Sequence, residues 1–266
     1  MNTSSTSLTL SHTVNDIGWV TMNREKTLNA QTPEMMSEIA DAVISFEKDE
    51  NIRAIVITGK GRAFSAGADL NYLDATTKKS AAEIRKSIYE NFMRAARAIA
   101  NSRKPTLASM RGPAFGAGCE LAIVCDFRII SDTAKFNETW AKLGLIPPLG
   151  GAFLLPHMVG LANARRMVLL SETIGAEEAI KIGLADRLVA DDSLEERTTA
   201  FAAELAATSP LGYAAGKDCL RRSLESSLVR EWEANSYTQG LLLNSDDFAE
   251  GLAALKGRRS PNFQGA

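Results

Sequence analysis

Apolar and polar residues alternate in the first part of the chain and then change to a helical spacing. Residues 7–14 ("SLTLSHTV") and 18–23 ("GWVTMN") are rich in β-forming residues and flank a short turn, a pattern that predicts a β-hairpin. Residues 32–50 then place apolar side chains at helical spacing, with Thr32 as the N-cap and Pro33 at the first helical position. The chain is therefore expected to begin with two paired strands and a helix.

The middle of the chain alternates between strand and helix patterns. Residues 52–59 and 105–112 are predicted to be short buried strands, and the amphipathic segment 81–102 between them is predicted to be a long helix. Such alternation is typical of parallel strands joined by right-handed crossovers. Beyond the middle of the chain the strand patterns stop and helix-like segments follow. We therefore predict an α/β core over residues 1–192 and a helical region over residues 193–266.

Composition and charge narrow the possible functions. The 266 residues are 45% hydrophobic and 23% charged, which fits a large globular α/β protein. Thirty Lys and Arg residues against 32 Asp and Glu residues give a net charge of −2, so the charge favours neither nucleic-acid nor membrane partners. The three cysteines and two histidines lack metal-ligand spacing, so no metal site is expected. Without a secretory leader pattern or a long apolar run, the sequence predicts a cytoplasmic protein.

Two glycine-rich turns follow the predicted buried strands. Residues 59–70 ("GKGRAFSAGADL") follow the first strand, and residues 111–121 ("RGPAFGAGCEL") follow the second. Open α/β sheets bind ligands at the carboxyl ends of their strands, and the second turn also leads into a helix whose N-terminus favours negative charge. Two N–H donors that converge from such turns would form an oxyanion hole. For either turn alone, a tight turn that needs glycine is the simpler interpretation.

Three motifs resemble those of a known family. Residues 64–70 ("FSAGADL"), 111–136 ("RGPAFGAGCELAIVCDFRIISDTAKF") and 143–151 ("LGLIPPLGG") occur in the order and at the spacing of the crotonase (enoyl-CoA hydratase/isomerase) superfamily. The resemblance implies a spiral of ββα units with a helical C-terminal trimerisation region, and assembly as a homotrimer or as a hexameric dimer of trimers. It also implies an enzyme that acts on an acyl-CoA thioester, with coenzyme A as part of the substrate and no separate cofactor.

The resemblance also implies roles for individual residues. By position in the motifs, the backbone N–H groups of Ala68 and Ala117 would form the oxyanion hole for the thioester oxygen. Glu120 falls where hydratases of the family keep one of two catalytic glutamates, and there it would remove or deliver the α-proton of the thioester. An acid that merely complements the dipole of its own helix is the alternative. The residues implied to contact coenzyme A are Arg62, Phe64, Ala66, Arg259 and Phe263.

The sequence departs from the family where a second acid is expected. Hydratases have their second glutamate where this chain has Trp140, and many isomerases have an acid where this chain has Pro148. Glu138 lies two residues before Trp140; either it enters the site or, as the helical turn predicts, it points elsewhere and is solvated or cap-stabilising. The residues expected to border the acyl pocket are Trp140, Pro148, Glu138 and Tyr72. Trp140 would either form the wall of that pocket or pack in the core.

A single carboxylate favours some reactions of the family over others. Moving a double bond between the α,β and β,γ positions needs one base, and Glu120 suffices for it, whereas hydration needs a second group that Trp140 does not supply. The sequence therefore predicts an enoyl-CoA hydratase/isomerase-like enzyme with little ordinary hydratase activity. Tyr72, Tyr89 or Glu90 is a further candidate for a missing polar group. Two alternatives stay open, namely C–C cleavage (hydrolytic or retro-Claisen) of a bulky or cyclic β-keto acyl-CoA, and a weakly catalytic acyl-CoA binder or scaffold.

Overall fold

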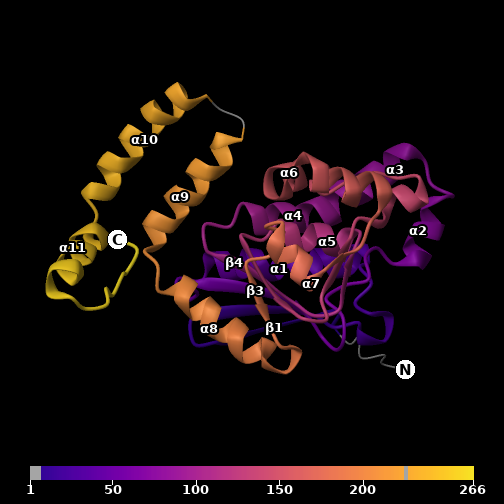
Figure 1. The fold of residues 1–266 in the computed structure, drawn as a ribbon, viewed down its shortest axis with the longest axis horizontal. Coiled ribbons are helices and arrows are strands. Elements are labelled where there is room, and N and C mark those ends of the chain that lie inside the picture. The colour runs from indigo at the N-terminus through magenta and orange to yellow at the C-terminus, as the bar shows by residue number, and fades with distance from the viewer. Residues whose placement is uncertain (1–6, 225–226) are drawn as a thin grey trace.

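The main sheet of the protein has six strands, in the order β1-β2-β3-β4-β6-β9. A computed structural model describes residues 7–224 and 227–266 (Figure 1). In the sheet, β1 and β2 pair antiparallel and the other neighbours pair parallel, so the predicted hairpin and parallel core are confirmed. The strands are β1 Thr9–Val14, β2 Ile17–Met22, β3 Ala54–Gly59, β4 Thr106–Met110, β6 Phe127–Ser131 and β9 Arg187–Val189.

A second, smaller sheet lies beyond the carboxyl ends of the main strands. Its strands are β5 Pro113–Phe115, β7 Lys135–Asn137 and β8 Ile174–Gly175, in that order. Strand β5 continues directly from β4 and pairs parallel with β7. The chain therefore turns from the large sheet into the small one at the second glycine-rich turn.

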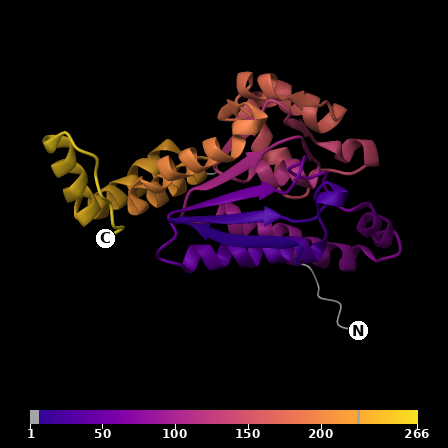
Figure 2. The same ribbon diagram turned by 90° about the horizontal axis from the view of Figure 1, so that it is seen from below.

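Helices cover both faces of the large sheet (Figure 2). Helix α1 begins as the sequence predicts, because the Thr32 side chain accepts a hydrogen bond from the N–H of Met35 and Pro33 occupies the first position. It packs with α4 over the larger apolar core, which extends to α5 and α6. The helices up to α7 are α1 Pro33–Lys48, α2 Leu70–Thr76, α3 Ala81–Ser87, α4 Met93–Ala100, α5 Ala117–Ile123, α6 Gly151–Leu170 and α7 Ala176–Lys181.

The predicted helix over residues 81–102 contains an irregular turn. A π-helical segment, Ile88–Phe92, joins α3 to α4, and the helix ends at Ala100. The π turn shifts the helical phase, which leaves Phe92 buried and Tyr89 half exposed.

The helical C-terminal region divides into a packed helix and a projecting arm. Helix α8 (Leu194–Ala206) covers the second face of the sheet, where Phe201 joins a smaller apolar cluster. The division predicted at residue 193 therefore falls at the start of α8, but α8 itself belongs to the packed body. The projecting part, here called the C-terminal arm, is residues 210–224 and 227–266 (Figure 1). It contains α9 Pro210–Ser223, α10 Leu228–Leu243 and α11 Asp246–Gly257.

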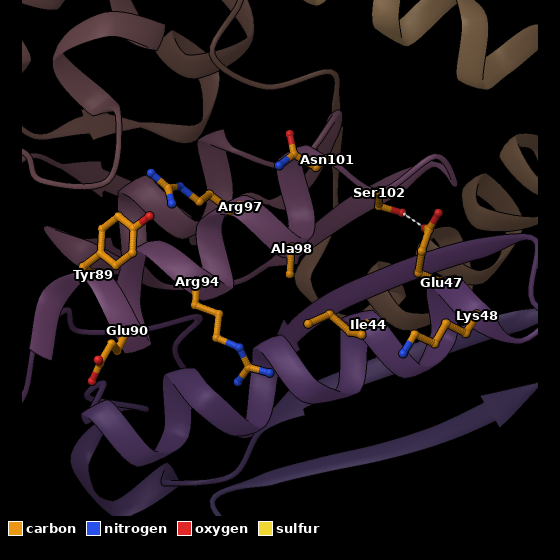
Figure 3. A pocket seen from close by; sticks show the side chains of 10 residues that line it. All are labelled: Ile44, Glu47, Lys48, Tyr89, Glu90, Arg94, Arg97, Ala98, Asn101 and Ser102. Carbon is orange, nitrogen blue, oxygen red and sulfur yellow. Dashed lines mark hydrogen bonds between the residues drawn. The ribbon is translucent and has the colours of Figure 1, made fainter. Parts of the chain in front are cut away.

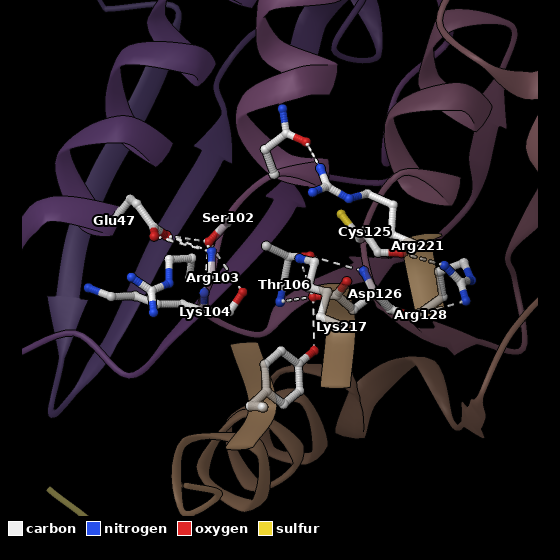
Figure 4. Close-up of polar contacts among 12 residues, drawn as sticks. Glu47, Ser102, Arg103, Lys104, Thr106, Cys125, Asp126, Arg128, Lys217 and Arg221 are labelled. Atoms are coloured by element: carbon white, nitrogen blue, oxygen red, sulfur yellow. Dashed lines mark hydrogen bonds and ion pairs between the residues drawn. The ribbon is translucent and has the colours of Figure 1, made fainter. Parts of the chain in front are cut away.

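Asp126 ties the C-terminal arm to the sheet. One of its carboxylate oxygens accepts hydrogen bonds from the N–H of Thr106 at 2.9 Å and from the hydroxyl of Tyr213 at 2.9 Å. The same oxygen pairs with the ammonium of Lys217 at 2.8 Å (Figure 4). These contacts are mostly shielded from water, so they fix the direction of α9 more firmly than a surface ion pair would. In the described ranges, no helix is both long and apolar enough to cross a membrane.

Candidate active site

The two glycine-rich turns lie in contact at the carboxyl ends of β3 and β4. The N–H of Ser65 donates to the carbonyl of Pro113 at 2.9 Å, and the N–H of Phe115 donates to the carbonyl of Ser65 at 3.0 Å. Gly67 has a φ of +98°, and a Cβ atom there would lie 2.6 Å from the carbonyl oxygen of Phe115. Both the conformation and the close contact require glycine. The turns therefore form one interlocked unit.

Two backbone donors adjoin this contact. Ala68 follows Gly67, and Ala117 opens α5, with its nitrogen 3.7 Å from the position that a Gly67 Cβ would take. Within residues 7–224 and 227–266, neither the N–H of Ala68 nor that of Ala117 donates to another group of the chain. The first N–H groups of a helix have no partner inside it, so the N–H of Ala117 can bind an external acceptor. These two N–H groups are the donors of the predicted oxyanion hole, and that role stays a prediction.

Glu120 lies in the first turn of α5, and its carboxyl is completely buried. Its Oε1 atom accepts hydrogen bonds from the N–H of Leu149 at 2.6 Å and from the N–H of Gly151 at 3.0 Å. These donors belong to the N-terminus of α6, so the carboxyl caps the neighbouring helix rather than serving its own. Its Oε2 atom has no partner among the described residues.

Sequence reasoning missed the two backbone donors that hold Glu120. They lie in "LGLIPPLGG", where Gly150, with a φ of +117°, ends the turn before α6. A pair of glycines before an apolar helix was the available signal, because such a turn exposes backbone N–H groups.

Burial controls the protonation of Glu120. Removal from water raises the pKa of its carboxyl from 4.5 to about 7, and the N–H groups of Leu149 and Gly151 oppose that rise. A carboxyl with such a pKa can both accept and return a proton near neutral pH.

The structure corrects the expectation for Glu138. Its side chain is neither solvated nor cap-stabilising: it is completely buried, and it makes no capping hydrogen bond to the short 3₁₀ helix that follows, Thr139–Leu143. Because its own φ and ψ of −88° and 81° are not helical, the side-chain direction expected from a helical turn does not apply. A Cβ on Gly151 would lie 3.1 Å from Oε1 of Glu138 and 3.3 Å from Cγ of Glu120. Both glutamates therefore meet at the same glycine.

Trp140 packs in the core, one of the two roles that the sequence left open, and its place in the wall of an acyl pocket stays a prediction. It is only 6% exposed and belongs to the larger apolar core. Two carbons of its indole lie 3.6 Å from the point that a Cβ on Gly116 would occupy, directly before Ala117. Its N–H group favours the ionised forms of Glu120 and Glu138, because it lowers the pKa of each carboxyl. Trp140 thus packs in the core and borders both acids.

Pro148 and Tyr72 lie on different sides of this region. Pro148 is half-buried and directly precedes Leu149, whose N–H holds Glu120. The hydroxyl of Tyr72 lies 3.2 Å from that of Ser87, and its ring stacks on Phe92 with 5.5 Å between the centroids. Tyr72 also lines a surface cavity of about 550 Å³. The sequence-based expectation that both residues border an acyl pocket stays a prediction.

The structure does not bring Tyr89 and Glu90 to the buried carboxyls. They line a separate cavity of about 570 Å³ between α1 and the π-helical segment with α4 (Figure 3). Tyr89 is 51% exposed, and the guanidinium of Arg97 stacks over its ring at 4.6 Å. A direct role for either residue at Glu120 is not supported.

The residues predicted to bind coenzyme A do not meet within one chain. Arg62 is exposed just beyond the end of β3, whereas the carbonyl of Phe263 accepts a hydrogen bond from Arg53 at the beginning of that strand. A six-residue strand spans about 20 Å, so the two ends are well separated. Arg259 pairs with Glu250 on the C-terminal arm at 2.6 Å.

Phe64 requires a further correction. Its side chain is completely buried in the core, so it cannot contact a ligand. Ala66 is half-buried and uses its N–H to bond the carbonyl of Leu28 at 2.8 Å. Among the described residues, no group of three or more His, Cys, Asp or Glu side chains is placed to hold a metal ion.

Comparison with known proteins agrees with this fold. The family model for enoyl-CoA hydratase/isomerase matches residues 12–266. A Mycobacterium leprae protein named "Probable enoyl-CoA hydratase" is 35% identical over 247 residues, covering 93% of this chain and 94% of the relative. The 1,2-epoxyphenylacetyl-CoA isomerase of Escherichia coli is 33% identical over 256 residues, covering 96% and 98%.

Solved structures share the same architecture. A crystal structure of an enoyl-CoA hydratase subunit from Geobacillus kaustophilus superposes with a TM-score of 0.90 at 30% identity, over 97% of this chain and 98% of that one. With its interlocked turns and buried glutamate, the chain belongs to the enoyl-CoA hydratase/isomerase family and has the crotonase fold.

Proposed function

We propose that the protein moves protons at the α-carbon of an acyl-CoA thioester, as an isomerase-like enzyme with Glu120 as its proton carrier. One observation carries the proposal: the buried carboxyl of Glu120 lies three residues after the free N–H of Ala117 on the same helix. Side chains on a helix lean toward its N-terminus, and the first N–H groups also point there, so an oxygen bound at Ala117 would lie at the helix end that the carboxyl of Glu120 leans toward.

The proposed reaction begins with the thioester oxygen bound to the N–H groups of Ala68 and Ala117. As a C–H bond next to the carbonyl, or conjugated with it, breaks, its electron pair moves toward that oxygen and forms an enolate. The two N–H groups and the N-terminus of α5 stabilise the new charge. The proton forms an O–H bond with Oε2 of Glu120, the oxygen that has no partner among the described residues. Return of the proton to the other end of the conjugated system shifts the double bond.

The binding of coenzyme A is part of the same proposal. Arg62 and the backbone of Ala66 follow β3 and lead directly to Ala68, so they would hold the pantetheine and nucleotide near the thioester end. Arg259 and Phe263 lie at the other end of β3 in their own chain, so they would reach a coenzyme A site only on a neighbouring copy. Coenzyme A enters as part of the substrate, and the proposed reaction needs no separate cofactor.

The relatives support the substrate class and leave the reaction open. Their names include both a hydratase and an isomerase of acyl-CoA compounds. The preference for isomerisation rests on this chain, since Trp140 and Pro148 stand where a second acid is expected.

Proton exchange in heavy water tests the proposal directly. The enzyme should exchange the α- or γ-protons of bound 2-enoyl and 3-enoyl thioesters and interconvert them, while hydration of crotonyl-CoA stays slow. A panel that also includes cyclic β-keto acyl-CoA thioesters would identify C–C cleavage. If the protein neither exchanges nor converts any of these thioesters, the proposed function is wrong.

A further inference from the structure

We propose that Glu138 is a positioning residue that stays protonated beside ionised Glu120, so that the two carboxyls carry a single negative charge between them. The inference rests on the proposed function for its kinetic consequences, and it names the group that tunes the proton carrier.

The geometry sets the two acids together in a closed space. Both side chains are completely buried, and both lie within 3.3 Å of the point that a Cβ on Gly151 would occupy. In the described part of the chain, the Oε2 atom of Glu120 and both carboxyl oxygens of Glu138 have no hydrogen-bond partner. The N–H of Trp140 and the S–H of Cys119 are the neighbouring donors for these three oxygens, so a proton kept by one of the two acids adds a third donor.

The surroundings decide which acid keeps the proton. Glu120 receives two backbone N–H groups from the start of α6, and these stabilise a negative charge. Glu138 receives no such bond; the groups that act on its carboxyl are Glu120, Cys119 and Trp140, and none of them is a cation. Burial and the charge of Glu120 raise the pKa of Glu138 well above 4.5. Two adjacent buried carboxyls cannot both ionise readily, so the proton stays on Glu138.

A protonated Glu138 supplies what Glu120 lacks. A neutral carboxyl is a hydrogen-bond donor, and the Oε2 atom of Glu120, whose side chain lies beside the same Gly151, is a buried acceptor without a partner among the described residues. An oxygen has two lone pairs, so Oε2 can accept this bond and still take a proton from a substrate. Glu138 would thereby hold the Glu120 carboxylate in one orientation and moderate its basicity, while its own proton stays in place during turnover.

Glu138→Gln and Glu138→Ala separate this role from that of a catalytic acid. An amide N–H₂ can replace the carboxyl O–H as donor, so Glu138→Gln should keep turnover within about threefold of wild type. Glu138→Ala removes the donor and should lower kcat about tenfold or more with little change in KM, because the base is then poorly oriented. The limb of the pH profile that reports ionisation of Glu138 should vanish in Glu138→Gln. Glu177→Gln, on the exposed first turn of α7, is the matched control and should leave kcat, KM and the pH profile unchanged.

Infrared spectroscopy supplies a readout that needs neither substrate nor turnover. The spectra are compared at pH 8.5, where Glu120, with a pKa of about 7, is ionised. The carbonyl band of a buried protonated carboxyl should then be present in wild type, should persist in Glu177→Gln and should be absent in Glu138→Gln. Because Glu138→Gln is nearly isosteric, it keeps this test available if Glu138→Ala fails to fold.

Three results would overturn the inference. They are a wild-type spectrum without the band, a Glu138→Gln variant as slow as Glu120→Gln, and a folded Glu138→Ala variant with unchanged kcat. Failure of the proposed function looks different: no acyl-CoA thioester is exchanged or converted, while the infrared band remains.

Discussion

The Oε1 atom of Glu120 lies 2.6 Å from the backbone nitrogen of Leu149 and accepts its hydrogen. This bond joins the first turn of α5 to the start of α6, two helices that are separated in sequence by β6, β7 and the 3₁₀ helix Thr139–Leu143. Glu120 follows Ala117 by three residues on α5, and the bond holds its carboxyl in one orientation. A ligand bound at the N–H of Ala117 would therefore meet a carboxyl whose position is already fixed.

The first prediction concerns that base. Glu120→Gln should lower turnover of the true thioester by about 10²- to 10⁴-fold, because the amide cannot accept and return the substrate proton. Thioester affinity should stay nearly unchanged, since Gln keeps the oxygen that bonds Leu149 and Gly151. Steady-state kinetics with calorimetric titration measures both. Near wild-type turnover in the variant would assign Glu120 a capping role for α6 alone.

The second prediction concerns stability and pH. The pKa of Glu138 is raised above 4.5 in the folded chain, so as pH rises the unfolded chain releases this proton first. Between the two pKa values the folded chain holds more protons, and the free energy of unfolding therefore falls as pH rises. The contribution is about 1.4 kcal/mol per pH unit while that difference lasts.

Glu138→Gln should remove this loss of stability. Its melting temperature should match wild type near pH 4.5 and exceed it increasingly toward pH 8, by roughly 2–4 °C for each kcal/mol. Thermal melts of both proteins across this range make the comparison. A constant difference at every pH would mean that Glu138 has an ordinary pKa in the folded chain.

The third prediction concerns the interlocked turns. Gly67→Ala should reduce activity by about 10²-fold, because the added Cβ would meet the carbonyl of Phe115 at 2.6 Å and displace the N–H of Ala68. The φ of +98° adds strain of about 1–3 kcal/mol. Gly216→Ala, inside α9 with open space around it, is the matched control and should stabilise the helix by about 0.5–1 kcal/mol. Activity assays and thermal melts together would show if the turn tolerates a side chain.

The fourth prediction is assembly. Tyr237, Leu241 and Leu255 on the C-terminal arm are each more than 70% exposed, which is unusual for large apolar side chains unless another surface covers them. We expect a homotrimer or a dimer of trimers. Light scattering at micromolar concentration would give the mass directly, and a monomer would contradict the prediction.

The anchor of the C-terminal arm offers a test of the same idea. Asp126→Asn removes the charge that Lys217 pairs with and weakens the bond to Tyr213, so α9 should loosen and the assembly should dissociate at higher concentration than wild type. Asp192→Asn, at an exposed acid in the 3₁₀ segment before α8, is the control for the charge change. If the assemblies of both variants dissociate at the same concentration, the contacts of Asp126 do not contribute to assembly.

The fifth prediction concerns coenzyme A. A ligand at a hundred times its dissociation constant stabilises the native state by about 2.7 kcal/mol, so millimolar acetyl-CoA should raise the melting temperature. Arg62→Ala should reduce this rise in melting temperature, because it removes an exposed cation in the first glycine-rich turn that would pair with the phosphates of coenzyme A. If acetyl-CoA raises the melting temperature of Arg62→Ala as much as that of wild type, the phosphates of coenzyme A bind elsewhere. If acetyl-CoA does not raise the melting temperature of wild type, the result counts against the proposed substrate class.

Local patterns predicted those parts of the protein that depend on short stretches of chain. The hairpin, the capped start of α1 and the parallel order of β3 and β4 follow from side-chain period and turn residues, which act over a few positions. The two glycine-rich turns were predicted for the same reason. Where one backbone segment packs directly against another there is no room for a Cβ atom, so the sequence has glycine at those positions. The motifs around Glu120 then indicated the family.

Only the tertiary structure decided what surrounds Glu120. The donors from Leu149 and Gly151 are about 30 residues away, and Glu138 reaches the same glycine because its backbone leaves β7 in a conformation that is not helical. The pKa of a buried carboxyl depends on all the groups that exclude water from it or donate hydrogen bonds to it. Those groups come from distant parts of the chain, so the sequence around one acid does not predict that pKa. For that reason the sequence predicted the candidate proton carrier, whereas only the fold placed Glu138 beside it and enclosed both carboxyls.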